Sequence, residues 1–282
     1  MAVVVITDSA SDISVARAQE YGVEIVPSWI VFGDERLRDG VDITREAFSQ
    51  RITTSWNVTH TEPVDIGDIE PVLRKHVEAG NECVVPVVSA KLSKTCENAR
   101  MAASRFGNAV RVVDTQTLSG GQMLQTLLAA EWARSGATAD EIVELLEFVK
   151  STQRGYQIVP DLAQLRRSGR LKPSIVVLCS VLKISPVLQV KQGEIEVAEQ
   201  TRSFERAQEV IIETAAQNAG DVNRTSFAVG HVGAPELADN IAAALRTRLM
   251  YPPRGFIIYE GGPTIAVNAG PGAIAVFSMT EA

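Results

Sequence analysis

Residues 84–103, VVPVVSAKLSKTCENARMAA, indicate both the fold of this chain and a first candidate site. An apolar, strand-like run ends at Ser89, a hydroxyl-rich turn follows, and a helix-forming segment begins near Ser93. The first N–H groups of a helix are unpaired and carry about half a unit of positive charge. With the hydroxyls of Ser89, Ser93 and Thr95 they predict an anion-binding turn. The alternative is that Ser93 or Thr95 only caps its own helix.

The sequence on either side of this segment alternates nearly all-apolar strands with helices. Such alternation predicts an α/β fold, here a Rossmann-like α/β/α domain over residues 1–155 with a mainly parallel sheet. Ligands of such sheets bind at the carboxyl ends of the strands, where ITDS, VVS and VVDT place polar residues. Helices are expected near residues 13–21, 46–51, 67–79, 93–103, 119–135 and 140–150.

The pattern changes near residue 155. Residues 156–282 predict an α+β domain with a mixed or antiparallel sheet, a hairpin around Gly193, and helices over 204–218 and 235–249. The segment PTIAVN, residues 263–268, is predicted as a strand, so that Asn268 and Gly270–Gly272 form a turn between two strands. A groove between the two domains is the expected ligand site.

Composition excludes several classes of protein. The net charge of −7 and the pI near 5.2 argue against nucleic-acid binding, and no run approaches a membrane span. The strand-like N-terminus predicts a cytoplasmic protein without a secretory signal. The cysteines are odd in number and widely spaced, so we expect buried thiols and neither disulfides nor a zinc site; they are Cys83, Cys96 and Cys179.

Sequence signatures of nucleotide-binding loops, serine hydrolases and zinc proteases are absent. Only His60, His76 and His231 could serve a histidine-based triad or metal cluster. We therefore predict no catalytic residues and no metal site. Asp8, Ser9 and Asp12 could bind a cation or a hydroxylated ligand, or could simply cap the first helix.

Six short motifs, taken in order, resemble the DegV family, whose characterised bacterial members are the fatty-acid-binding subunits of fatty acid kinase. They cover nearly the whole chain, and SAKLSKT is similar to the family's S-x-x-L-S-G-T. The others are ITDSASDIS, VPSWIVFGDERLRDGVDIT, VVDTQTLSGGQ, LRRSGRLK and TIAVNAGPGAIAV.

The resemblance implies a buried acyl chain whose carboxylate is held by a Thr, a Ser and a His. Ser93 matches the Ser, and Thr61 matches the Thr, with Thr59 as a competing choice. Asn268 stands at the histidine position, where an amide can donate a hydrogen bond but carries no charge. Lys94 replaces the glycine after Ser93, which either adds a cation beside the anion or alters the turn.

The same resemblance implies that a separate kinase subunit docks on this chain and supplies ATP and Mg²⁺. Arg170 matches the family's Gly-Gly-Arg turn, and Arg202 matches an Arg after the Gly193 hairpin. The basic cluster that includes Arg167 is the expected docking face, or else a solvated surface. No cofactor is expected on this chain, and peripheral membrane contact could accompany lipid exchange.

The apolar segment over residues 175–190 is the candidate wall of the acyl tunnel, with Val176, Leu178 and Leu182 on it, although a core strand explains it equally well. We expect a noncatalytic carrier that presents a long-chain fatty acid to an ATP-dependent kinase for acyl-phosphate formation. The alternative is a lipid- or carboxylate-responsive interaction protein that undergoes no phosphoryl transfer. An enzyme acting alone is disfavoured, because no base is paired with Ser93.

Overall fold

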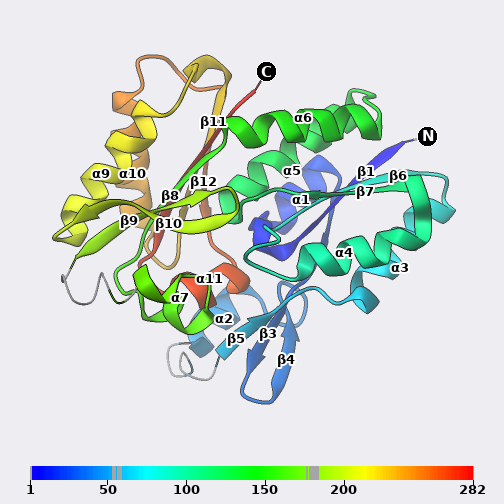
Figure 1. Ribbon diagram of the computed structural model, residues 1–282, viewed down its shortest axis with the longest axis horizontal. Helices are drawn as coiled ribbons and strands as arrows, with labels where there is room; N and C mark the ends of the chain where they lie inside the picture. The colour runs from blue at the N-terminus through cyan, green and yellow to red at the C-terminus, as the bar shows by residue number, and fades with distance from the viewer. Residues whose placement is uncertain (1, 53–54, 56–58, 176, 178–183, 282) are drawn as a thin grey trace.

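The computed structural model describes residues 2–52, 55, 59–175, 177 and 184–281, and it contains a parallel sheet and a mixed sheet side by side (Figure 1). The parallel sheet has the strand order β2-β1-β6-β7. Its strands are β1 (Val3–Asp8), β2 (Val23–Val26), β6 (Glu82–Val87) and β7 (Val110–Asp114). The predicted Rossmann-like parallel sheet is confirmed.

Helices cover both faces of the parallel sheet. On one face, α3 (Ile66–Glu78) and α4 (Thr95–Ala103) pack on a core that includes Ile69, Leu73 and the buried thiols of Cys83 and Cys96. On the other face lie α1 (Val15–Tyr21), α5 (Ser119–Arg134) and α6 (Ala139–Thr152). Among the described residues, no helix is long and apolar enough to cross a membrane.

The second sheet is mixed, as predicted, with the order β10-β9-β8-β13-β11-β12. Strands β11 and β12 run parallel, and the other neighbouring pairs run antiparallel. Two helices, α9 (Phe204–Gln217) and α10 (Pro235–Arg248), cover its outer face. The strands are β8 (Arg154–Ile158), β9 (Ser185–Lys191), β10 (Glu194–Thr201), β11 (Thr225–His231), β12 (Gly255–Glu260) and β13 (Ile274–Thr280).

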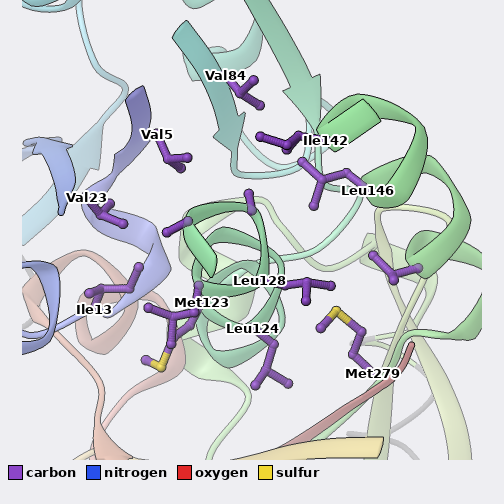
Figure 2. Close-up of a cluster of buried hydrophobic side chains, with 14 of the residues drawn as sticks. Val5, Ile13, Val23, Val84, Met123, Leu124, Leu128, Ile142, Leu146 and Met279 are labelled. Atoms are coloured by element: carbon purple, nitrogen blue, oxygen red, sulfur yellow. The ribbon is translucent and has the colours of Figure 1, made fainter. Parts of the chain in front are cut away.

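Helix α5 is the layer that both sheets share. Its residues from Ser119 to Ala130 are all buried. Figure 2 shows Met123, Leu124 and Leu128 of this helix in one cluster with Val5 of the parallel sheet and Met279 of the mixed sheet. One continuous core therefore joins the two sheets. The chain enters the second sheet at Arg154, and a division into units near residue 155 stays a prediction.

A third, small sheet was not expected from the sequence. The chain leaves the parallel sheet after Val26, and β3 (Trp29–Phe32) pairs antiparallel with β4 (Glu35–Arg38) and β5 (Thr59–Glu62). Pro27 lies at the break, where it has no N–H to donate to a strand ladder. Thr61, predicted in a loop, lies in β5 instead.

The predicted strand over 263–268 is wrong, because this segment forms helix α11 (Pro263–Ala269). Pro263 occupies the first helical position, where its missing N–H costs nothing. The segment is apolar and buried on most sides, so its periodicity could not separate a strand from a helix. The Asn268 turn therefore joins a helix to β13 and does not join two strands.

The β9–β10 hairpin contacts the Ser89 turn of the parallel sheet through Gly193. The Ser89 hydroxyl donates to the Gly193 carbonyl at 2.8 Å. Gly193 has a φ of +82°, and a Cβ built on it would lie 2.5 Å from the Ser89 Oγ atom. Glycine is therefore required here both by the backbone conformation and by the close approach.

Gly193→Ala should destabilise the fold more than Gly80→Ala, which serves as a matched control. Gly80 has the same φ of +82° with nothing within 4 Å of its Cβ position. The left-handed conformation costs alanine about 1–2 kcal/mol at either site, and the clash with Ser89 adds about 1–3 kcal/mol at Gly193 alone. Urea unfolding of both variants measures the decrease in the free energy of unfolding. Equal decreases in the two variants would show that Gly193 does not approach Ser89 closely.

Candidate functional site

A pocket opens where the carboxyl ends of the parallel strands face the small sheet, α11 and the mixed sheet. Its polar side chains come from six separate segments and its remaining wall is mainly apolar. They are Ser28, Thr61, Ser93, Gln157, Arg170, Thr264 and Asn268, with Glu62 at the edge. The structure thus brings Ser93, Thr61 and Asn268 to one cavity. The resemblance to the DegV family implied this grouping, and the local sequence pattern did not.

Ser93 both shapes its own turn and lines the pocket. Its Oγ atom accepts the Thr95 N–H at 3.2 Å and lies 3.0 Å from the Thr95 hydroxyl. Thr95 is 1% exposed, and its hydroxyl oxygen accepts the Val64 N–H at 3.2 Å. When the Thr95 O–H donates to Ser93, the Ser93 O–H is left to donate into the pocket. The capping role and the binding role are therefore compatible.

Thr61 and Asn268 form a second pair of donors. The Asn268 Nδ2 group donates to the Thr264 carbonyl at 2.7 Å and to the Thr61 hydroxyl oxygen at 3.3 Å. This contact leaves the Thr61 O–H free to donate to a ligand. The competing residue, Thr59, donates instead to the Ser55 carbonyl at 2.7 Å and does not line the pocket. Asn268 thus orients Thr61 from α11.

Arg170 also lines this pocket, a placement that sequence reasoning missed when it assigned the residue to partner docking. It follows helix α7 (Ala163–Ser168), and its Nη1 group donates to the Ser168 carbonyl at 2.9 Å. Burial lowers the pKa of the Arg170 guanidinium. An arginine remains charged at neutral pH even so, because its unperturbed pKa lies far above 7. The pocket therefore contains a half-buried cation.

The other predicted site residues lie outside the pocket. Lys94 is exposed and lines an outer cavity beside the Ser93 turn. Arg167 is exposed on α7 and hydrogen-bonds to Gln164, and Arg202 is exposed between β10 and α9. The roles of Arg167 and Arg202 in partner docking stay predictions, and so does the role of Lys94 beside the carboxylate. Of the predicted tunnel wall, Val176, Leu178 and Leu182 lie outside the described residues, and so does Cys179.

The polar pocket continues into an apolar inner compartment. Leu118, Gln157, Ile265 and Ala269 line both spaces, which therefore adjoin. The far wall comes from β11, β12 and β13 of the mixed sheet and includes Gly230, His231, Tyr259, Ile274 and Phe277. This wall was not predicted, because its residues look like ordinary core positions until the sheet is assembled.

A buried polar network adjoins the inner compartment. The Asp12 carboxylate accepts the Ser119 hydroxyl at 2.5 Å and the Gly262 N–H at 2.7 Å. The Tyr259 hydroxyl lies 2.7 Å from the Ser119 hydroxyl and accepts the Gly120 N–H at 2.8 Å. Burial raises the pKa of Asp12 to about 7, against the opposing effect of the Arg45 charge. Asp12 thus links the two halves of the chain and does not cap α1.

Asp8 has a different role from Asp12. Its carboxylate accepts the Ala10 N–H at 2.9 Å and the Val88 N–H at 2.9 Å, so it caps the short 3₁₀ helix Ser9–Ser11, whereas Ser14 caps α1. Gln122 of α5 also donates to it at 2.8 Å. Asp8 therefore ties the end of β1 to the start of the Ser89 turn.

The histidines do not assemble a catalytic or metal site. His76 lies 2.5 Å from Glu24, His60 is exposed on β5, and His231 accepts the Ala234 N–H at 3.3 Å. Burial lowers the pKa of His231, which favours its neutral form. In the described part of the chain, no three His, Cys, Asp or Glu side chains gather as metal ligands would.

These features define a class of protein: an α/β protein with a pocket that has a polar outer end and an apolar inner end. The DegV family model, described as an uncharacterised protein family, matches residues 2–281, and the chain belongs to this family. A DegV domain-containing protein of Streptomyces coelicolor is 32% identical over 276 residues, covering 97% of each chain. A DegV domain-containing protein of Mycobacterium tuberculosis is 30% identical over 277 residues, covering 98% of this chain and 96% of its own.

Solved structures agree with this assignment. A fatty-acid-binding DegV family protein from Thermus thermophilus has a TM-score of 0.89 at 27% identity, covering 99% of this chain and 100% of its own. DegV of Bacillus subtilis, a fatty acid binding protein, has a TM-score of 0.90 at 25% identity and full coverage of both chains. The fold is therefore that of the DegV proteins.

Asp12→Asn should weaken the pH dependence of stability. The ordinary pKa of an Asp is near 3.9, and burial raises that of Asp12 to about 7. The folded state therefore holds this proton more tightly, and its contribution is lost as pH rises from about 4 through 7. Asn keeps the left-handed backbone of residue 12, whose φ is 56°. Urea unfolding between pH 5 and 8 measures the slope.

The exposed Asp34→Asn is the control and should keep the slope of the wild-type protein. Burial also raises the pKa values of Asp8 and Asp39, so a smaller slope of the same sign should remain in Asp12→Asn. Identical slopes in Asp12→Asn and the wild-type protein would contradict the assignment of Asp12.

Proposed function

We propose that this protein binds a long-chain fatty acid, with the carboxylate in the polar pocket and the acyl chain in the inner compartment. The observation that carries the proposal is the junction of the two spaces: hydroxyl donors and Arg170 at one end, and a wall of apolar side chains at the other. The solved relatives from Thermus thermophilus and Bacillus subtilis, which are fatty acid binding proteins, support it.

The energetics favour such a ligand. Burying an acyl chain contributes on the order of 0.8 kcal/mol per CH₂ group, so a tail of about 14 to 18 carbons contributes roughly 10 kcal/mol before ordering costs. A carboxylate removed from water needs compensating partners. The hydroxyls of Ser93 and Thr61 line the pocket and can each donate an O–H to the carboxylate. Asn268 hydrogen-bonds to Thr61, and Arg170 supplies opposite charge.

The proposal extends to the role of the bound acid. The chain is a noncatalytic carrier that presents the carboxylate to a separate ATP-dependent kinase, which holds ATP and Mg²⁺ and forms the acyl phosphate. Among the described residues, the Ser93 hydroxyl hydrogen-bonds only to Thr95, so no neighbouring base activates it. Arg167, Arg170 and Arg202 form the proposed docking face.

In this proposal, residues 1–155 and residues 156–282 contribute different parts of the binding site. Residues 1–155 supply Ser93 from a loop and Thr61 from β5 to bind the carboxylate, and residues 156–282 supply most of the acyl-chain compartment. We place the protein in the cytoplasm, where peripheral contact with a membrane would allow the lipid to exchange.

Protein purified from a bacterial host should carry fatty acid, and Ser93→Ala should retain less of it. Loss of one hydrogen bond to a charged group costs about 1.5–3 kcal/mol, which corresponds to an affinity at least tenfold lower. Mass spectrometry of the denatured protein measures the retained lipid, and titration with palmitate measures affinity.

Ser104→Ala is the matched control for this measurement. Ser104 is an exposed hydroxyl at the end of α4 that donates to the Met101 carbonyl at 2.7 Å. Retention should not change in this variant. Absence of any lipid, with no uptake on incubation, would refute fatty acid binding, and unchanged affinity in Ser93→Ala would remove Ser93 from the site.

A second function is favoured by Asn268. An amide cannot carry a proton to or from the headgroup near neutral pH, so the chain could act as a lipid-responsive interaction protein without phosphoryl transfer. With the cognate kinase, Asn268→His should raise the rate of acyl-phosphate formation if the carrier role is correct. A wild-type protein that binds lipid, with neither form supporting phosphorylation, would favour the interaction protein.

A further inference from the structure

A buried amide lies in the wall between the polar pocket and the inner compartment. Gln157 belongs to β8 and is 7% exposed, and it lines both spaces. Tyr156 and Ile158, the residues on either side of it, belong to the core cluster under α9 and α10 on the outer face of the mixed sheet. Because side chains alternate along a strand, Gln157 lies on the inner face of this sheet, the face that borders the ligand pocket.

The amide of Gln157 lacks a partner. Its Nε2 group is buried and has no hydrogen-bond acceptor among the described residues. The residues paired with Gln157 on the neighbouring strands are Leu188 of β9 and Ala275 of β13, and neither has a polar side chain. A buried donor without an acceptor is costly, and an apolar residue of similar size would avoid this cost. A ligand that offers an acceptor at this point therefore suits the wall better than a plain acyl chain does.

Asn268 shows the opposite deficiency in the polar pocket. Its Nδ2 group has two N–H donors, which it gives to the Thr264 carbonyl and to the Thr61 hydroxyl oxygen. Asn268 therefore has no donor left for a carboxylate. Its Oδ1 atom is buried and accepts no hydrogen bond from the described residues. An acceptor oxygen gains nothing from a carboxylate, which is itself only an acceptor, whereas the O–H group of a ligand would satisfy it.

We propose that the ligand of this protein is a hydroxy fatty acid, whose hydroxyl group lies close to the carboxyl end and hydrogen-bonds to Gln157 and Asn268. The inference rests on the proposed function and deepens it by naming the class of acid. A hydroxyl group has one O–H donor and two acceptor lone pairs. It therefore matches both the donor left on Gln157 and the acceptor left on Asn268, while Ser93 and Thr61 bind the carboxylate.

The positions of the two amides limit where the hydroxyl group lies on the acyl chain. Gln157 and Asn268 both line the polar pocket, together with Ser93 and Thr61, and of the two amides Gln157 alone also lines the inner compartment. With the carboxylate bound in the polar pocket, a hydroxyl group on carbon 2 or carbon 3 lies at this junction. A hydroxyl group at the far end of the chain lies away from both amides. A ketone has no O–H group and would leave Asn268 without a donor.

The test compares four acids of equal chain length: palmitate, 2-hydroxypalmitate, 3-hydroxypalmitate and 16-hydroxypalmitate. The wild-type protein should bind the 2-hydroxy or the 3-hydroxy acid about tenfold more tightly than palmitate, because palmitate leaves both amides without a partner. The 16-hydroxy acid should show no such gain, because its hydroxyl group lies at the far end of the chain. Competitive displacement of a fluorescent fatty acid measures all four affinities.

Gln157→Leu should reduce the preference for the hydroxy acid to less than about threefold and should bind palmitate at least as tightly as the wild-type protein does. Leucine is of similar size and needs no hydrogen-bond partner, so urea unfolding should show no loss of stability in this variant. Gln189→Leu is the matched control, because Gln189 lies on the adjacent strand β9 and lines neither space. The preference should persist in Gln189→Leu.

Two results would contradict the assigned contacts. A preference that survives in Gln157→Leu would remove Gln157 from the site, and an equal gain for the 16-hydroxy acid would show that the hydroxyl group acts away from both amides. The same experiment separates this inference from the proposed function. A wild-type protein that binds palmitate as tightly as the 2-hydroxy and 3-hydroxy acids refutes the hydroxy-acid inference alone. A protein that binds none of the four acids refutes fatty acid binding and the inference together.

Discussion

The burial of helix α5 between two sheets is the constraint on which the rest of the structure depends. From Ser119 to Ala130 this helix has no solvent-exposed face. Its first turn lies so close to the mixed sheet that a Cβ on Gly120 would be 2.7 Å from the Tyr259 hydroxyl. Because the helix packs on both sides, the two sheets share one core, and the carboxyl ends of the parallel strands are held opposite the mixed sheet.

The ligand pocket is a consequence of that arrangement. The two sheets meet closely at α5 but leave space beyond its N-terminus, where Leu118 borders both the polar pocket and the inner compartment. Hydrogen bonds link the polar groups near this junction. The Asp12 carboxylate accepts from Ser119 and Gly262, and Asp39 accepts the Thr264 hydroxyl at 2.5 Å. Buried carboxylates are costly unless hydrogen-bonded. These contacts therefore stabilise one relative placement of the strands and helices that surround the ligand.

The headgroup site illustrates how local and nonlocal effects combine. The Ser93 turn is built locally, by hydrogen bonds to Thr95 two residues away. Thr61 and Asn268 are 207 residues apart and meet only because α11 packs against β5. Arg170 reaches the same pocket from the end of α7.

Much of the N-terminal half could be predicted from the sequence by itself. The apolar strands, the turn at Ser93 and the long helix from Ser119 have local signals, namely hydrophobic periodicity, caps and turn residues, and the structure agrees with them. The motifs also pointed to the family. Residues 263–269 show the limit of local signals. This run is almost entirely apolar, so its periodicity does not distinguish a helix from a strand, and in the structure it forms a helix that packs against β5 and α7.

Only the tertiary structure decided which distant residues share a site. Asp12 looked like a cap, yet its carboxylate reaches Ser119 and Gly262, and the pKa of Asp12 rises because both halves of the chain bury it. Arg170 looked like a surface charge, yet it lines the pocket. The reason is physical: caps, turns and periodicity act over a few residues, whereas burial and the meeting of Thr61 with Asn268 depend on how α5 and α11 pack between sheets. The sequence determined most of the elements and the family, and packing determined α11, the small sheet and the pocket.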